Sequence, residues 1–196
     1  MKRFTREWLI TIGLFAVIVA IFGRYLVFNE TRMGAVLDDP LLALLPSRDL
    51  AWPIFIGIYG LLLGALWTLR YDTARVRVGV QAYTLLTVFR MTAMYLTPLE
   101  IPAGLIVLRD PFVENVTGGA VFTKDLFFSG HTSLLFLAAL TVPKWKVIFY
   151  TGAAIVASML LVQHAHYTVD VFAAPFFSYV ALRTVETVHL KYLSRP

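Results

Sequence analysis

The chain has 196 residues, of which 59% are hydrophobic and only 15% are charged, and its formal net charge is +5. This composition excludes an ordinary soluble domain and indicates an integral membrane protein. The absence of cysteine excludes disulfides, a thiolate nucleophile and zinc sites with sulfur ligands. The basic residues lie mostly in loops on one side of the expected helices, which indicates an oriented membrane protein and argues against a nucleic-acid partner.

Six apolar stretches follow one another, each with a length that suits a membrane-spanning helix of roughly 17 to 25 residues. We therefore expect an all-α, polytopic membrane protein whose six transmembrane helices form one bundle and one domain over residues 1–196. In the second stretch, Gly60 and Gly64 fit the small-xxx-small pattern of close helix packing. The expected spans are residues 8–28, 50–69, 78–99, 126–142, 147–163 and 167–190.

The basic residues also predict the orientation, because cytoplasmic loops carry an excess of Lys and Arg. Of the 17 Lys and Arg residues, eleven fall on the side of the two termini and five on the other side, while Arg90 lies inside the third span. Both termini are therefore expected in the cytoplasm. The residues that could carry chemistry then fall on the periplasmic or lumenal face, together with the loop 100–125, which is long enough for a lid or a re-entrant segment.

Two polar stretches open the fourth and sixth apolar runs: residues 129–132 read Ser-Gly-His-Thr and residues 166–170 read His-Tyr-Thr-Val-Asp. Ionisable residues at membrane depth are costly, so they are candidates for function. If the chain is helical from His166, Asp170 lies one turn further on the same face and can hold the imidazole in one tautomer. The alternative is that both stretches are only polar helix caps.

A Ser-Gly-His turn at the start of a helix presents backbone N–H groups that can bind an anion. Two histidines and a carboxylate beside it, at the membrane surface, predict an anionic lipid headgroup as substrate, with phosphate as the anion. One histidine can attack phosphorus while the other protonates the departing alkoxide. The expected partners are therefore membrane phospholipids and lipid alcohols, and a homo-oligomer is compatible with the sequence.

Three stretches resemble motifs of the sphingomyelin synthase family, which belongs to the type 2 phosphatidic acid phosphatase superfamily. Residues 125–132 are similar to its Asp-x-x-x-Ser-Gly-His-Thr motif, and residues 166–171 to its His-Tyr-x-x-Asp-Val motif. Residues 89–97 resemble its motif around Arg-x-x-Thr-Met-Tyr, with one residue inserted. The resemblance covers residues 80–175 well and extends to the six-span plan.

The resemblance implies a lipid phosphotransferase that moves a phospholipid headgroup phosphate onto ceramide or diacylglycerol through a phosphohistidine. By this resemblance His166 is the nucleophile, Asp170 orients it, and His131 is the general acid and later the base. Neither a metal nor an organic cofactor is implied. The residues expected to bind the substrate are Ser129, Gly130, Asp125, Arg90, Lys124 and Tyr167.

A hydrolase that uses the same site, either a lipid phosphatase or a phospholipase C-like enzyme, is the alternative reading. The phosphatase branch carries a Lys-x6-Arg-Pro motif, which is absent here, and an arginine six residues before the nucleophile, where this chain has Leu160. These missing cations favour transfer. A lipid transporter or scaffold would need no His–Asp pair beside a Ser-Gly-His turn.

Three residues leave alternatives open. Lys124 either supplies charge for the phosphate or is an ordinary loop lysine, and Arg90 either binds the headgroup or forms a buried pair with a carbonyl or an acid. His164 could join His166 and Asp170 as a zinc ligand, although no further ligand is evident. The chain lacks the long soluble N-terminal extension of animal synthases, which favours a bacterial or minimal form in an inner membrane.

Overall fold

The computed structural model describes residues 2–109 and 121–193. This part contains seven α-helices and a π-helical turn, which confirms the all-α fold. The expected lid segment falls partly at residues 110–120, outside the described residues. The helices are α1 (Lys2–Glu30), α2 (Pro40–Leu44), α3 (Ala51–Leu69), α4 (Thr73–Leu96), α6 (Gly130–Thr141), α7 (Lys146–Val162), α8 (Thr168–Val188) and the π-helix η1 (His189–Leu193).

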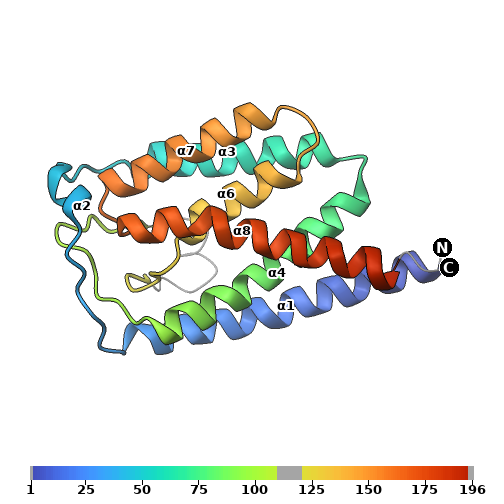
Figure 1. Cartoon of the computed structure of the whole chain (residues 1–196), viewed down its shortest axis with the longest axis horizontal. Coiled ribbons are helices and arrows are strands. Elements are labelled where there is room, and N and C mark those ends of the chain that lie inside the picture. The colour runs from blue at the N-terminus through green and yellow to red at the C-terminus, as the bar shows by residue number, and fades with distance from the viewer. Residues whose placement is uncertain (1, 110–120, 194–196) are drawn as a thin grey trace.

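The long helices run side by side in an elongated bundle, and α6 lies near its centre (Figure 1). α6 packs against α3, α4, α7 and α8, and α1 packs along α4. Where α4, α6 and α8 meet, the core is built from fully buried side chains such as Leu86, Phe128 and Ala174. Small and branched apolar residues at these positions let the helices approach closely and exclude solvent.

The helices begin and end close to the predicted boundaries. The prediction of six membrane-spanning helices is nevertheless wrong when the length and composition of each helix are considered. Among the described helices, two are long and apolar enough to cross a membrane, over Thr5–Glu30 and Ala51–Leu69. α6 and α7 have only 12 and 17 residues, which is less than the roughly 20 residues that cross a bilayer. α4 and α8 are long enough, but they carry charged residues: Arg75, Arg77 and Arg90 in α4, and Asp170, Arg183 and Glu186 in α8.

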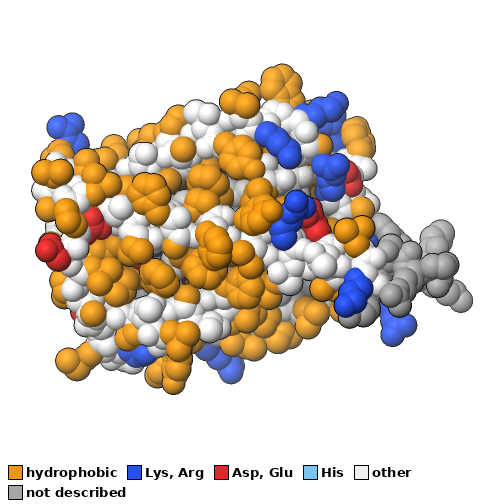
Figure 2. All heavy atoms as spheres, in the orientation of Figure 1, with side chains coloured by type: hydrophobic (Ala, Val, Ile, Leu, Met, Phe, Trp, Pro, Cys, Tyr) orange, Lys and Arg blue, Asp and Glu red, His pale blue; other side chains and the backbone are white. Residues whose placement is uncertain are grey.

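The exterior of the bundle is nevertheless strongly apolar. Trp52 and Phe172 are 74% and 71% exposed, and many other large hydrophobic side chains are also exposed. In Figure 2 these side chains cover the middle of the visible face, while Lys and Arg side chains gather toward the end where α1 begins and α8 ends. Both histidine motifs start helices at the opposite end. Two apolar helices and an apolar exterior of this extent indicate membrane association.

Close packing in α3 depends on Gly57. A Cβ on Gly57 would lie 2.6 Å from Cγ2 of Val156 in α7, so any larger side chain there must displace the neighbouring helix. A Cβ on Gly60 would meet nothing within 4 Å, and one on Gly64 would make an ordinary 3.5 Å contact with Phe149. Gly57 and Gly64 therefore both face α7, as expected for glycines that allow close helix approach, whereas Gly60, the other member of the small-xxx-small pair, does not.

We expect Gly57→Leu to destabilise the bundle by about 1–3 kcal/mol, because an over-packed interface forces helices apart. Gly60→Leu adds the same side chain to the same helix in open space and should leave stability nearly unchanged. Thermal unfolding of both variants in one detergent measures the difference. Equal melting temperatures for the two variants would contradict the α3–α7 contact.

Candidate active site

The start of α6 is built by the Ser-Gly-His-Thr stretch. Ser129 is the N-cap residue, and its Oγ accepts a hydrogen bond of 3.4 Å from the backbone N–H of Thr132. The backbone N–H of Ser129 donates to the carbonyl oxygen of Asp170 at 3.1 Å, which ties the start of α6 to the first turn of α8. Ser129 is fully buried, so its hydroxyl serves the helix cap.

The start of α8 holds the second motif, and the helix begins at Thr168, one residue after the predicted start of the sixth span. Tyr167 is its N-cap, and His166 lies just before it. Asp170 folds back, so that its Oδ2 accepts the backbone N–H of Tyr167 at 3.1 Å and lies 3.4 Å from Nδ1 of His166. The expected His166–Asp170 contact is therefore present, but it arises from an N-terminal cap rather than from one face of a helix.

Asp170 is fully buried, and within the described part of the chain its Oδ1 has no hydrogen-bond partner. A buried carboxylate with a vacant oxygen strongly favours a nearby hydrogen-bond donor or positive charge. His166 is the titratable group beside it. The pair is therefore placed to stabilise an imidazolium or a modified imidazole at His166.

The two histidines face one small cavity of about 60 Å³. His131 enters it from the first turn of α6, with its ring edge-on to Phe55 of α3 at 6.5 Å between centroids, and His166 enters it from the start of α8. Asp125 lines the same cavity. The other lining residues are Leu105, Val107, Leu108, Phe122, Thr123 and Ala165.

Arg90 forms the buried ion pair that was one of its two expected roles. Its Nη2 lies 2.5 Å from Oδ1 of Asp125, its Nε donates to the carbonyl oxygen of Phe128 at 3.3 Å, and its guanidinium lies over the ring of Phe22. Burial alone would raise the pKa of Asp125, but the charge and hydrogen bond of Arg90 outweigh it and hold this pKa below its usual value. Asp125 is therefore ionised in the cavity wall.

Gly130 is required by the position of Arg90. A Cβ on Gly130 would lie 2.4 Å from Nη1 of Arg90 and 2.5 Å from its Cζ. The guanidinium therefore occupies the space that a side chain would need. The glycine of the Ser-Gly-His stretch thus lets α4 and α6 approach each other around a buried cation.

Lys124 and Tyr167 form hydrogen bonds and an ion pair with residues in the loops around the site. Nζ of Lys124 lies 2.8 Å from Oε1 of Glu100 and donates to the carbonyl oxygen of Arg32 at 2.8 Å. The Tyr167 hydroxyl donates to the carbonyl oxygen of Glu100 at 3.1 Å and accepts the N–H of Leu37 at 3.3 Å. Neither residue lines the cavity that contains the histidines. Both instead fasten the chain around the site.

His164 also contacts backbone carbonyl groups and does not line the cavity. Its Nδ1 lies 2.8 Å from the carbonyl oxygen of Ala103, and its Nε2 lies 3.0 Å from that of Leu45. The ring therefore connects the loop before α3 to the loop that walls the cavity. Within residues 2–109 and 121–193, no three His, Cys, Asp or Glu side chains are grouped as metal ligands would be.

Two residues that the sequence did not single out complete these loop contacts. The fully buried Gln163 accepts the N–H of Leu50 at 2.9 Å and donates to the carbonyl oxygen of Ile106 at 3.3 Å. Asp39 accepts the N–H and hydroxyl of Thr168 at 2.6 and 2.9 Å. Gln163 could have been singled out from the sequence, because a glutamine at the end of an apolar run is unusual. Asp39 could not, because nothing in the sequence distinguishes it from other acidic residues in loops.

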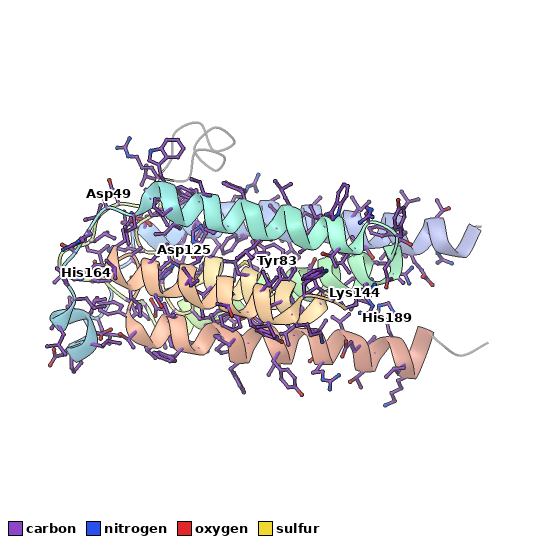
Figure 3. All side chains as sticks on the ribbon, turned by 90° about the horizontal axis from the view of Figure 1, so that it is seen from above. Asp49, Tyr83, Asp125, Lys144, His164 and His189 are labelled. Carbon is purple, nitrogen blue, oxygen red and sulfur yellow. The ribbon has the colours of Figure 1, made fainter. Side chains whose placement is uncertain are left out.

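Figure 3 shows how the ionisable groups divide between the ends of the bundle. Asp125 and His164 lie at one end, and Lys144 and His189 lie at the other. The structure thus brings His131, His166, Asp170 and Asp125 together with Arg90 and Gly130 at a single end. Ser129, Lys124 and Tyr167 form hydrogen bonds and an ion pair around this group.

Residues 124–187 match the family model described as PAP2 superfamily C-terminal. The matched segment contains α6, α7 and α8 and both histidine stretches. A comparison with curated protein sequences finds no significant match. At the level of the superfamily, the match indicates a lipid phosphatase or phosphotransferase type of activity for this segment.

Replacing Arg90 should make the fold depend on pH in a way that reports on Asp125. Because Arg90 lowers the pKa of Asp125 in the folded state, the ion pair stabilises the fold above the ordinary aspartate pKa of about 3.9 and loses this effect as the pH falls through the folded-state value. Arg90→Gln should therefore cost about 3 kcal/mol near pH 7, where it leaves a carboxylate unpaired.

This cost should shrink steadily as the pH is lowered below 4, because protonation of Asp125 removes the unpaired charge. Thermal melts of the wild type and Arg90→Gln across this pH range measure it, with the exposed Arg183→Gln as the matched control. A cost that is independent of pH would contradict the ion pair.

Proposed function

We propose that this chain is a membrane-embedded lipid phosphotransferase resembling sphingomyelin synthase. It moves a phospholipid headgroup phosphate onto a lipid alcohol, either ceramide or diacylglycerol. The observation that carries the proposal is that His131 and His166, from two different helices, face one small cavity while Asp170 contacts Nδ1 of His166. The superfamily match supports the general type of activity, and the synthase-like motifs support transfer.

In the first half-reaction, His166 is the nucleophile. Its Nδ1 faces Asp170, which leaves Nε2 as the nitrogen that attacks phosphorus. The nitrogen–phosphorus bond forms while the bond from phosphorus to the donor's lipid oxygen breaks. His131 gives its proton to this departing oxygen, and the positive charge on the His166 imidazole is balanced by the Asp170 carboxylate.

In the second half-reaction, His131 acts as a base. It takes the proton of the acceptor hydroxyl, whose oxygen attacks phosphorus as the bond to His166 breaks. The headgroup phosphate is now on the acceptor, His131 is protonated again, and His166 is regenerated. We expect the positive N-terminal end of α6, from which His131 enters the cavity, to stabilise the phosphoryl oxygens in both steps.

The cavity wall supports transfer over hydrolysis. Leu105, Val107 and Leu108 form the apolar part of this wall, and apolar side chains beside the histidines reduce the access of water to a reactive phosphohistidine. Asp125 is ionised but paired with Arg90, so the pair adds little net charge beside the histidines.

We place the site on the periplasmic or lumenal face of the membrane, with both termini in the cytoplasm, as in a bacterial inner membrane. The excess of basic residues on the side of the termini supports this orientation. It agrees with a bundle in which α1 begins and α8 ends away from the histidines (Figure 1).

Transfer is tested with purified protein and vesicles of phosphatidylcholine, phosphatidylethanolamine and phosphatidylglycerol, all labelled in the headgroup phosphate. Adding ceramide or diacylglycerol should move the label into a new phospholipid, and without an added acceptor little label should become water-soluble. His166→Ala should lose this transfer. His189→Ala, which changes a histidine at the opposite end of the bundle, should keep it.

Release of water-soluble label that is the same with and without an acceptor would overturn transfer in favour of hydrolysis. Release of inorganic phosphate from phosphatidic acid, with no new phospholipid formed, would do the same.

A further inference from the structure

A second and larger hollow, of about 250 Å³, opens between α1, α3, α4 and α6. Along α6 it begins at Leu134, one turn or about 4.5 Å after His131, and continues to Thr141 toward the basic end, while along α4 it begins at Tyr83, seven residues or about 10 Å before Arg90. Figure 3 places Tyr83 between Asp125 and the basic end of the molecule. The hollow exists because small residues stand where four helices meet: Ala65, Gly79 and Ala138.

The lining of this hollow is apolar almost throughout, with side chains such as Phe15, Leu66 and Leu137. An apolar space without polar partners gives water no hydrogen bonds, so it favours hydrocarbon. Along α3 it extends from Leu62 to Leu69, which is about 10 Å at 1.5 Å per residue. A stretch of this length fits part of a single acyl chain, which would gain dispersion contacts with the lining side chains.

A cation stands where the hollow ends. Leu69 is the last lining residue of α3, and the exposed Arg70 follows it directly. The Arg70 guanidinium lies 4.3 Å from the ring centre of Trp67 and 4.6 Å from that of Tyr71, and its Nη1 donates to the Trp67 carbonyl oxygen at 2.6 Å. Two rings and a carbonyl thus hold this cation at the level where the apolar lining stops.

Two neighbouring arginines of α4 are paired with acids. Arg75 pairs with Asp72 at 3.0 Å, and Arg77 pairs with Glu7 of α1. These acids offset the two arginines, whereas Arg70 contacts rings and a carbonyl. A headgroup phosphate at Arg70 would therefore meet a net positive end of the bundle.

We propose that this hollow binds one acyl chain of an anionic phospholipid whose phosphate contacts Arg70. The proposal depends on membrane embedding but not on the chemistry of the histidines, because the hollow and the histidine cavity share no lining residue. The lipid fills the junction of α1 with α3, α4 and α6. It thereby stabilises the packing of α1 against α4, the helix that contains Arg90. The basic end is an unsuitable interface for a second copy of the chain, whose own basic end would repel it.

The test is native mass spectrometry of the full chain, released from detergent after incubation with equal amounts of dioleoylphosphatidylglycerol and dioleoylphosphatidylcholine. We expect one retained phosphatidylglycerol per chain, at least fivefold preferred over phosphatidylcholine. Gly79→Leu should fill the hollow and abolish retention, since its Cβ alone makes only an ordinary 3.5 Å contact with Thr141. Gly60→Leu, whose side chain enters open space, should retain the lipid.

Arg70→Gln should keep the hollow but reduce the preference for phosphatidylglycerol to below twofold. Arg183→Gln removes another exposed arginine and should leave the preference unchanged. Because Arg70 is exposed, this variant should fold even if Gly79→Leu does not. Equal retention of both lipids by the wild type would overturn the proposal, as would a dimer without lipid that Gly79→Leu dissociates. Lipid retention is read without turnover, so failure of headgroup transfer would not affect this result.

Discussion

The ion pair of Arg90 and Asp125 is the interaction on which the candidate site depends. A guanidinium inside an apolar bundle is tolerated only when it is paired and hydrogen-bonded. Here it binds Asp125, the Phe128 carbonyl and the Phe22 ring, and it fills the space beside Gly130. The pair therefore fixes the segment that leads into α6, and with it the position at which His131 enters the cavity.

The other half of the site is held by the turn between α7 and α8. Gln163, His164 and Tyr167 bind backbone groups of loops that are distant in sequence, and Asp39 binds the first residue of α8. The contacts of Gln163 and His164 hold the loop that contains Leu105 and Leu108, which lines the cavity together with His166. Because the loops are held by buried hydrogen bonds, the two histidines stay in place without a substrate to organise them.

The sequence predicted the helices and the contact of His166 with Asp170 better than it predicted the surrounding loops. Apolar runs gave six helices near the right places, since burial and lipid both select such runs, but the length and charge of α4, α6, α7 and α8 correct the number of spans. The pairing of His166 with Asp170 was also predicted, although through a helix rather than a cap. The contacts of Lys124 and His164 were not predictable, because their partners lie in loops whose path depends on tertiary structure.

The division of work between the two histidines is tested most directly by leaving-group dependence. His131→Ala lacks only the proton donor in the first step, so a nitrophenyl phosphodiester, whose leaving group needs little protonation, should restore release of nitrophenol in part. His166→Ala lacks the nucleophile and should remain inactive toward it, with no covalent phosphoenzyme. If the nitrophenyl substrate restored activity to His166→Ala and not to His131→Ala, the assignment of nucleophile and acid would be contradicted.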